Sequence, residues 1–250
     1  PHDLWAQLTF LDAIPKMAYH PFKYTFCSLG GFMGKQIIGV QNEDRLNKIV
    51  NGCGFRAKKE QWLDLPEKMY TTRSLEMTKL QKQVYQDLET ELYSYIEESD
   101  QEVSAQLVIT KLIKLQQVAS GFIIPDEGNI IELDGGSPKM GEIEEILEQT
   151  TSKLLIPCTF KRSIDMLMER LKCYSPTFIR GGMKSEEIEE QKDKFNNYKD
   201  HRVCILQMDS AKYGHTLIGS EKAGFCHVEA FYENTFSLDA RSQIEDRIHR

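Results

Sequence analysis

The strongest constraint on the fold is the alternation, after residue 137, of short β-rich runs with amphipathic helices. The predicted strands are Lys153–Ile156, Thr177–Ile179, Val203–Leu206 and His227–Tyr232. Helical spacing over 163–171 and 185–195 separates the first three. Strands that alternate with helices in this way form a parallel sheet with helices on its faces, so the predicted fold class is α/β. Functional loops are expected where the strands end, at 157–162, 180–184, 207–216 and 233–242.

The first 136 residues carry mainly helical patterns. Apolar residues recur at helical spacing from Leu4 to Leu11 and again over 42–50. Between them, the glycine- and aromatic-rich stretch 21–34 predicts irregular structure. A long helix is expected after Thr78, and a second over 103–120 that ends at Gly121. These patterns divide the chain into a helical region at 1–65, a helical linker at 66–136 and an α/β domain at 137–250.

Composition excludes several classes of protein without identifying a partner. A net charge of −7 argues against a uniformly basic nucleic-acid-binding surface, although a local basic stripe is compatible with it. The six cysteines lack metal-site spacing, so we expect no metal ligands, no disulfide framework and mostly buried, reduced thiols. No apolar run could span a bilayer and the N-terminus does not resemble a signal peptide. We therefore expect no membrane partner, and a location in the cytoplasm, or in the nucleus if the cell is eukaryotic.

The last eight residues, Gln243–Arg250, are the segment best suited to chemistry. On a helix, Gln243, Asp246, Arg247 and Arg250 would share one face. A guanidinium donates two parallel hydrogen bonds to phosphate and keeps its charge at any working pH. Taken alone, the same pattern also fits a solvated surface helix with internal ion pairs.

The segments that precede this motif give it a more specific meaning. Phe231–Glu233, Phe236–Leu238 and Gln243–Arg250 resemble the strand, aromatic turn and motif VI helix of the Swi/Snf-type ATPases of helicase superfamily 2, in particular bacterial or phage-like members. Further matches stand upstream in the family's order: Ser137–Lys139 at the entry to the second motor domain, Lys153–Ile156 with Phe160 as motif IV, Arg180–Gly182 as the next loop, and Leu206–Leu217 as motif V. Further back, the segments Arg56–Lys59, Leu63–Lys68 and Leu112–Gln117 match the family's linker between its two motor domains, and Asp3–Trp5 with Phe10–Leu11 resembles the stretch just after motif III. The resemblance therefore covers nearly the whole chain. It implies a RecA-like parallel sheet sandwiched by helices at 137–250, preceded by the linker at 66–136 and by a helical remnant of the first motor domain at 1–65.

The resemblance also implies roles for individual residues. In such a motor, ATP and Mg²⁺ lie between two RecA-like domains and are held mainly by the N-terminal one, which this chain lacks. Arg247 and Arg250 would be the catalytic arginines that reach the phosphates. The remaining candidates are Gln243, Asp246 and Gly214 at the nucleotide, and Lys161, Arg180, Ser210 and Lys212 at a nucleic acid, expected to be double-stranded DNA.

Several features depart from the family pattern. The chain contains neither a G-x-x-x-x-G-K-[S/T] loop nor an acidic D-E-x-H box, so we expect it to be a fragment, cut within motif VI, that cannot hydrolyse ATP alone. Arg180 stands where the family often has Asp, and Phe236 where it usually has Trp. Two alternatives remain at this point. One is a non-catalytic RecA-like scaffold that binds nucleic acid or protein, and the other is a different α/β enzyme.

Overall fold

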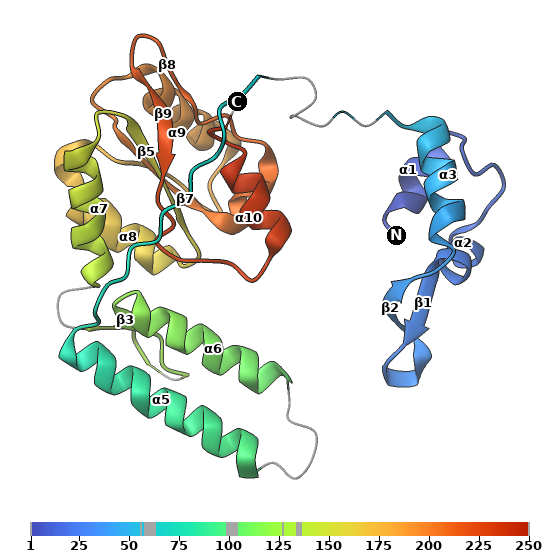
Figure 1. The fold of residues 1–250 in the computed structure, drawn as a ribbon, viewed down its shortest axis with the longest axis horizontal. Coiled ribbons are helices and arrows are strands. Elements are labelled where there is room, and N and C mark those ends of the chain that lie inside the picture. Colours follow the sequence, from blue (N-terminus) through green and yellow to red (C-terminus); the bar gives the residue numbers. More distant parts are fainter. Residues whose placement is uncertain are drawn as a thin grey trace. The chain divides into compact units, whose positions relative to one another are not determined.

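The computed structural model describes residues 2–55, 57, 64–98, 105–126, 128–133 and 137–249, without the side chains of 32, 95–98, 105–107 and 211–213. The chain forms two compact units, Pro1–Leu65 and Pro66–Arg250 (Figure 1). Each has its own hydrophobic core.

The first unit combines three helices with a β-hairpin. Its elements are α1 (Leu4–Phe10), α2 (Tyr19–Phe26), β1 (Cys27–Gly30), the 3₁₀ helix η1 (Phe32–Gly34), β2 (Gln36–Val40) and α3 (Glu43–Cys53). The helices predicted near 4–11 and 42–50 are confirmed. The irregular stretch predicted at 21–34 is wrong, because Phe22 and Phe26 lie one helical turn apart and are fully buried in the core of this unit. Strands β1 and β2 then pair antiparallel around the turn at Gly31.

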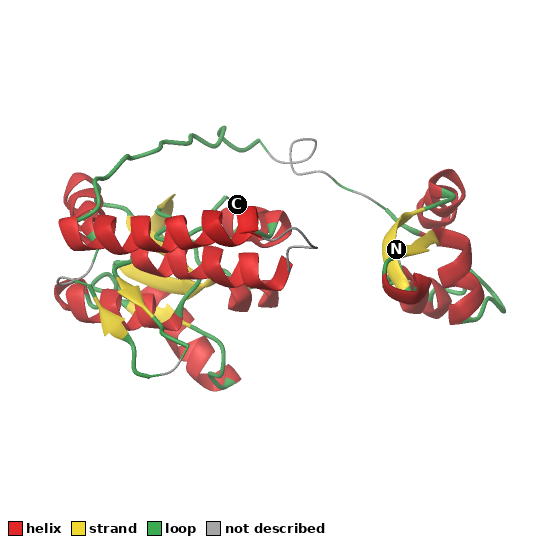
Figure 2. Cartoon of the chain, turned by 90° about the horizontal axis from the view of Figure 1, so that it is seen from below, coloured by secondary structure: helices red, strands yellow, loops and turns green. Residues whose placement is uncertain are grey.

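The second unit begins with an extended segment and a pair of helices. Residues 64–78 form neither helix nor strand, so the linker predicted to be helical over 66–136 is helical only from Lys79 onward. Helices α5 (Lys79–Glu98) and α6 (Ala105–Ala119) pack side by side, and they are the two long red helices of the larger unit in Figure 2. The Gln81 side chain is fully buried and donates to the carbonyl of Val118 at 3.0 Å, which holds the two helices together. The short strands β3 (Phe122–Ile123) and β4 (Ile131–Glu132) follow.

The rest of this unit is an α/β domain. Its elements are α7 (Pro138–Gln149), β5 (Lys153–Cys158), α8 (Lys161–Arg170), η2 (Lys172–Tyr174), β6 (Thr177–Ile179), α9 (Ser185–Asn197), β7 (Val203–Gln207), η3 (Met208–Tyr213), β8 (Gly219–Ser220), β9 (Gly224–Glu229) and α10 (Leu238–Glu245). The strand order is β6-β7-β5-β9-β8. The first four strands are parallel, as predicted, and the edge strand β8 is antiparallel to β9.

Alternate residues of the central strands supply two cores, one on each face of the sheet. Leu154 and Ile156 pack with buried residues of α7 and α8, whereas Leu155 packs with Phe195 of α9 and Ile244 of α10. Helices therefore cover both faces, as Figure 1 also shows. The prediction of a RecA-like parallel sheet sandwiched by helices is confirmed.

Two further expectations concern the thiols and the membrane. The cysteines of the described residues are free thiols, of which Cys53 and Cys173 are exposed and the other four are buried. Burial raises the pKa of Cys204 to about 12, so this thiol stays protonated and unreactive. No helix in the described part of the chain has the length and apolar composition needed to cross a bilayer.

Candidate functional site

The loops predicted to carry function lie at one edge of the sheet. Because β5, β6, β7 and β9 are parallel, their carboxyl ends meet there, and each is followed directly by one of these loops. Hydrogen bonds join described side chains of this edge into a network that is centred on the loop after β5.

The carboxylate of Glu233, 3% exposed, joins the loop after β9 to the start of α8. Its Oε2 accepts the backbone N–H of Thr159 at 2.6 Å and of Phe160 at 3.0 Å, while its Oε1 accepts the Ser163 hydroxyl. These are N–H groups at a helix start that have no partner within the helix, where a negative charge is also favoured by the helix dipole. Glu233 thus serves α8 as a capping carboxylate supplied by a distant segment.

Gln207, the last residue of β7, connects the two neighbouring loops. Its amide oxygen accepts the N–H of Gly181 at 2.8 Å, and its amide nitrogen donates to the carbonyl of Thr159 at 3.4 Å. The loops after β5, β6 and β7 are therefore fastened to one another.

Arg241 of α10 extends the network toward the C-terminus. Its guanidinium stacks 3.5 Å from the ring centroid of Phe231, donates to the Asn234 side chain at 2.9 Å and pairs with Glu245 at 2.7 Å. The carbonyl of Asn234 accepts the Thr159 hydroxyl at 3.2 Å. The aromatic turn predicted before motif VI is thus tied to α10 on one side and to the loop after β5 on the other.

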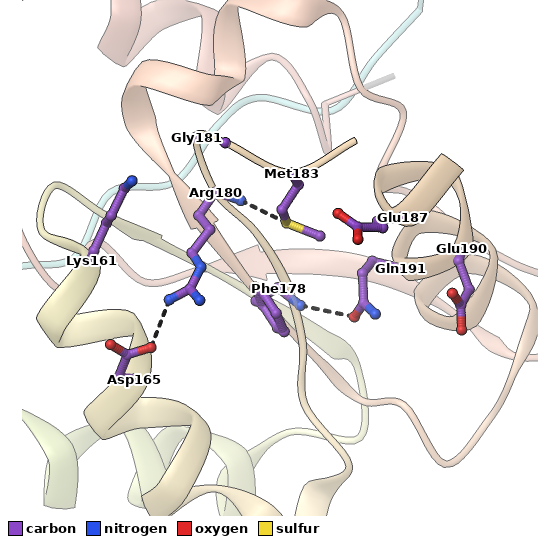
Figure 3. A pocket seen from close by; sticks show the side chains of 10 residues that line it. Lys161, Asp165, Phe178, Arg180, Gly181, Met183, Glu187, Glu190 and Gln191 are labelled. Carbon is purple, nitrogen blue, oxygen red and sulfur yellow. Dashed lines mark hydrogen bonds and ion pairs between the residues drawn. The ribbon is translucent and has the colours of Figure 1, made fainter. Parts of the chain in front are cut away.

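Lys161 and Arg180 border an open cleft of about 700 Å³ between α8 and α9 (Figure 3). The Arg180 guanidinium lies 5.3 Å from the Phe178 ring centroid and pairs with Asp165 at 2.7 Å. Glu187 and Glu190 also line the cleft, so two cations face three carboxylates. The excess of negative charge in the cleft does not favour phosphate binding. Arg180 would have to break its ion pair with Asp165 to bind a phosphate.

The predicted motif V loop forms η3 and the turn after it. Ser210 is buried, and Gly214 is exposed with a φ of +67°, a conformation that glycine adopts without strain. The backbone of Lys212 lies in η3, and its side chain is outside the description. Burial and the charge of Lys192 lower the pKa of His215, and Arg247 acts in the same direction. The neutral, buried imidazole of His215 fits a structural role.

Helix α10 packs on η3, which brings the predicted motifs V and VI together. The hydroxyl of Ser237 accepts the N–H of Ala240 at 3.3 Å and so caps the helix start. The helix ends at Glu245, so the prediction that one helical face carries Gln243, Asp246, Arg247 and Arg250 is wrong. The N–H of Arg247 bonds the carbonyl of Ile244 at 2.8 Å, a three-residue turn that closes the helix.

The four residues predicted on that face therefore lie in different environments. Gln243 is exposed, Asp246 is half-buried and paired with Lys68 at 3.0 Å, and Arg247 is 8% exposed. Arg250 lies outside the described residues.

Comparison with known structures identifies the type of fold. No protein-family model matches the sequence, and no curated protein matches it. Among solved structures, the C-terminal part of the Fun30 ATPase domain is 18% identical with a TM-score of 0.57, over 74% of this chain and 81% of that one. The SWI2/SNF2 ATPase core domain of Sulfolobus solfataricus is 19% identical with a TM-score of 0.54, over 92% of this chain and 52% of that one. The chain has the fold of a SWI2/SNF2 ATPase C-terminal half. It spans about half the length of the Sulfolobus core.

The SWI2/SNF2-type fold confirms, at the level of architecture, the resemblance predicted from the motifs. The structure brings Gly214 and Arg247 to neighbouring turns, and Lys161 and Arg180 to one cleft. Among the described residues, no group of His, Cys, Asp and Glu side chains could hold a metal ion.

Sequence reasoning missed three side chains that organise this edge: Glu233, Gln207 and Arg241. Glu233 and Gln207 directly follow or end predicted strands, so a search for polar residues at strand ends would have found both. Arg241 and its partner Glu245 are four residues apart on one helix, a spacing that predicts an ion pair.

Proposed function

We propose that this chain contributes the C-terminal motor half of an ATP-driven translocase of the SWI2/SNF2 type that acts on double-stranded DNA. The observation that carries the proposal is the placement of Arg247. This buried arginine lies in the turn after α10, a helix that packs on η3, and its charge helps to lower the pKa of His215 in the loop after β7, in a unit with the SWI2/SNF2-type fold.

The arginine would act through charge. In the closed motor, ATP would lie between this unit and an N-terminal RecA-like domain, with Mg²⁺ neutralising part of the phosphate charge. Arg247, together with Arg250, would stabilise the charge that develops on the γ-phosphate during hydrolysis, and Gln243 would help to orient them. Asp246 forms an ion pair with Lys68. We therefore propose that the Asp246 carboxylate stabilises the turn and does not contact the nucleotide directly.

The nucleic-acid contacts proposed for this half differ in their support. Lys161 is exposed at the first position of α8, so its ammonium group is accessible to a phosphate. Arg180 is engaged by Asp165 and Ser210 is buried, so both would contact DNA only after a local rearrangement. Lys212 is proposed as a DNA contact only because of its position in the loop after β7.

The test is DNA-stimulated ATP hydrolysis by the full-length protein that contains this chain. Arg247→Ala should lower kcat by roughly 10³-fold or more while DNA affinity is largely kept. Arg170→Ala is the matched control, because Arg170 is an exposed arginine of α8 that pairs with Glu144, and it should leave kcat unchanged. Wild-type hydrolysis in the Arg247→Ala variant would refute the proposal. DNA binding without any ATPase activity would favour a binding scaffold.

A further inference from the structure

We propose that the extended segment Pro66–Tyr70 positions Arg247 by holding the chain on both sides of it, with Lys68 as the principal positioning residue. The inference rests on the function proposed for Arg247 and assigns a positioning role to a segment that the sequence resemblance matched only to the linker between the two motor domains. In Figure 1 this segment is the beginning of the teal trace that runs from near the C-terminus of the chain to α5.

The contacts before Arg247 involve two acidic residues at the end of α10. Lys68 Nζ lies 3.0 Å from Asp246 Oδ1 and 3.8 Å from Glu245 Oε2. The Tyr70 hydroxyl donates to Glu245 Oε2 at 2.9 Å. The other oxygen of Glu245 accepts from Arg241, so this carboxylate is held from the helix and from the extended segment together.

The contact after Arg247 is made by a backbone carbonyl. The ring nitrogen Nε2 of His249 lies 2.9 Å from the carbonyl oxygen of Pro66, which can only accept, so Nε2 carries the proton. Pro66 and Lys68 are two residues apart in an extended segment. Lys68 therefore holds the turn one residue before Arg247, and Pro66 holds it two residues after Arg247.

These contacts matter because Arg247 lies beyond the end of its helix. Within a helix the backbone direction is fixed by the repeating hydrogen bonds, whereas the N–H of Arg247 makes the three-residue bond to Ile244 that closes the helix. On the inner side, Ile244 is fully buried and Ile248 packs against the same core. The core and the extended segment thus hold the turn from opposite sides and fix the direction in which the guanidinium leaves the backbone.

The ion pairs persist at neutral pH. Burial acts to lower the pKa of Lys68, but the hydrogen bond and charge of Asp246 outweigh it and raise that pKa above its usual range. Burial acts to raise the pKa of Glu245, but hydrogen bonds from Arg241 and Tyr70 outweigh it and lower that pKa. Both groups therefore stay charged wherever the motor would work.

The irregular chain that continues after Tyr70 supplies a matched control. Arg73, five residues after Lys68, pairs with Glu142 and donates to Gln149 at 2.9 Å, and both partners belong to α7. Removing its charge loosens the segment at α7 and leaves the contacts of Lys68, Tyr70 and Pro66 in place.

The first experiment follows amide hydrogen exchange in the 250-residue chain. Lys68→Met should raise the exchange rates of Asp246 and Arg247 by roughly two- to fivefold, the range expected for partly exposed ion pairs, without a change at β5 and β7. Lys68→Arg should restore the rates, and Arg73→Met should leave them unchanged. Equal exchange at 246–247 in the wild type and Lys68→Met overturns the inference, whatever the ATPase activity.

The second experiment uses ATP hydrolysis by the full-length protein. Lys68→Met should lower kcat severalfold with little change in the KM for ATP, because it misplaces a group needed in the transition state. Lys68→Arg should recover the rate. If Arg247→Ala lowers kcat but Lys68→Met does not, the positioning role is wrong while the proposed function stands. If Arg247→Ala itself has no effect, the proposed function fails and the exchange result still reports on the contact.

Discussion

Glu233 is the residue on which the loops at the carboxyl edge of the sheet depend most. Its buried carboxylate accepts from two backbone N–H groups and from Ser163. Removing it takes the acceptor from one buried hydroxyl and from two partly buried N–H groups, which costs more than the bonds themselves contribute. We expect Glu233→Ala to lower the free energy of unfolding by roughly 2–4 kcal/mol, as measured by urea denaturation. Glu148→Ala, at an exposed position of α7, should change it by less than about 0.5 kcal/mol. An equal effect of both substitutions would contradict this role.

A second carboxylate, that of the partly buried Glu229, has its Oε1 atom shielded from solvent and predicts a pH-dependent stability. Burial raises its pKa from 4.5 to about 8, and the charge of Glu245 adds to the rise. Between these values the folded state keeps a proton that the unfolded state releases, so the contribution of Glu229 is fully present below 4.5 and is lost as pH rises toward 8. Glu229→Gln cannot lose that proton. The variant should match the wild type near pH 4.5 and exceed its stability at pH 8, by an amount on the order of 2 kcal/mol. Thermal unfolding across this range tests it, and a constant difference between the two proteins would contradict it.

At the residue scale, the sequence predicts which residues are candidates better than it predicts their burial and their interaction partners. The strand pattern placed Arg180 and Gly214 in loops that follow β6 and β7, whereas Arg247, expected on a helix, lies in the turn after α10. It could not predict that Arg180 pairs with Asp165, since an ion pair depends on side-chain geometry between two elements. Burial of Ser210 likewise depends on how η3 packs against α10, which no local pattern specifies.

At the scale of elements, local patterns predicted most helices and strands but failed where a distant segment decides the outcome. The continuous apolar runs of β5 and β7 and the amphipathic spacing of α8 and α9 are strong local signals. Helix α10 was predicted to reach Arg250, because its spacing continues beyond Glu245. Its end is held by Lys68, which lies 178 residues earlier in the chain than Asp246, and sequence periodicity contains no information on that contact.

The start of α7 offers a test of how one element joins the helical region to the sheet. The Ser137 hydroxyl accepts the N–H of Lys139 at 3.3 Å and donates to the carbonyl of Ala119 at the end of α6, at 3.0 Å. Ser137→Ala should therefore lower the free energy of unfolding by about 1–2 kcal/mol, the usual loss for a helix cap. Ser185→Ala provides the comparison, since Ser185 is exposed inside the first turn of α9 and is not its cap. The prediction fails if guanidinium denaturation gives equal values for both variants.

At the scale of the whole molecule, net charge and local charge make different predictions about DNA. The chain carries a net charge of −7, which repels DNA at long range. The cleft between α8 and α9 adds no basic surface, because its two cations face three carboxylates and Arg180 is paired with Asp165. We therefore expect this chain alone to bind duplex DNA weakly, through Lys161 in particular.

Release of Arg180 should strengthen that binding. Asp165→Asn removes the partner of Arg180 and one negative charge from the cleft, so we expect roughly three- to tenfold tighter binding to a short duplex, and a salt dependence steeper by about one phosphate contact. Glu169→Gln makes the same change in net charge near the other end of α8, where Glu169 faces Lys172 and does not line the cleft. Fluorescence anisotropy titrations at several salt concentrations measure both quantities. If the two variants gain affinity equally, the effect comes from net charge and Arg180 is not a phosphate contact. If Asp165→Asn alone gains, and Asp165→Asn with Arg180→Ala loses the gain, the cleft contacts the DNA backbone once its internal ion pair is broken.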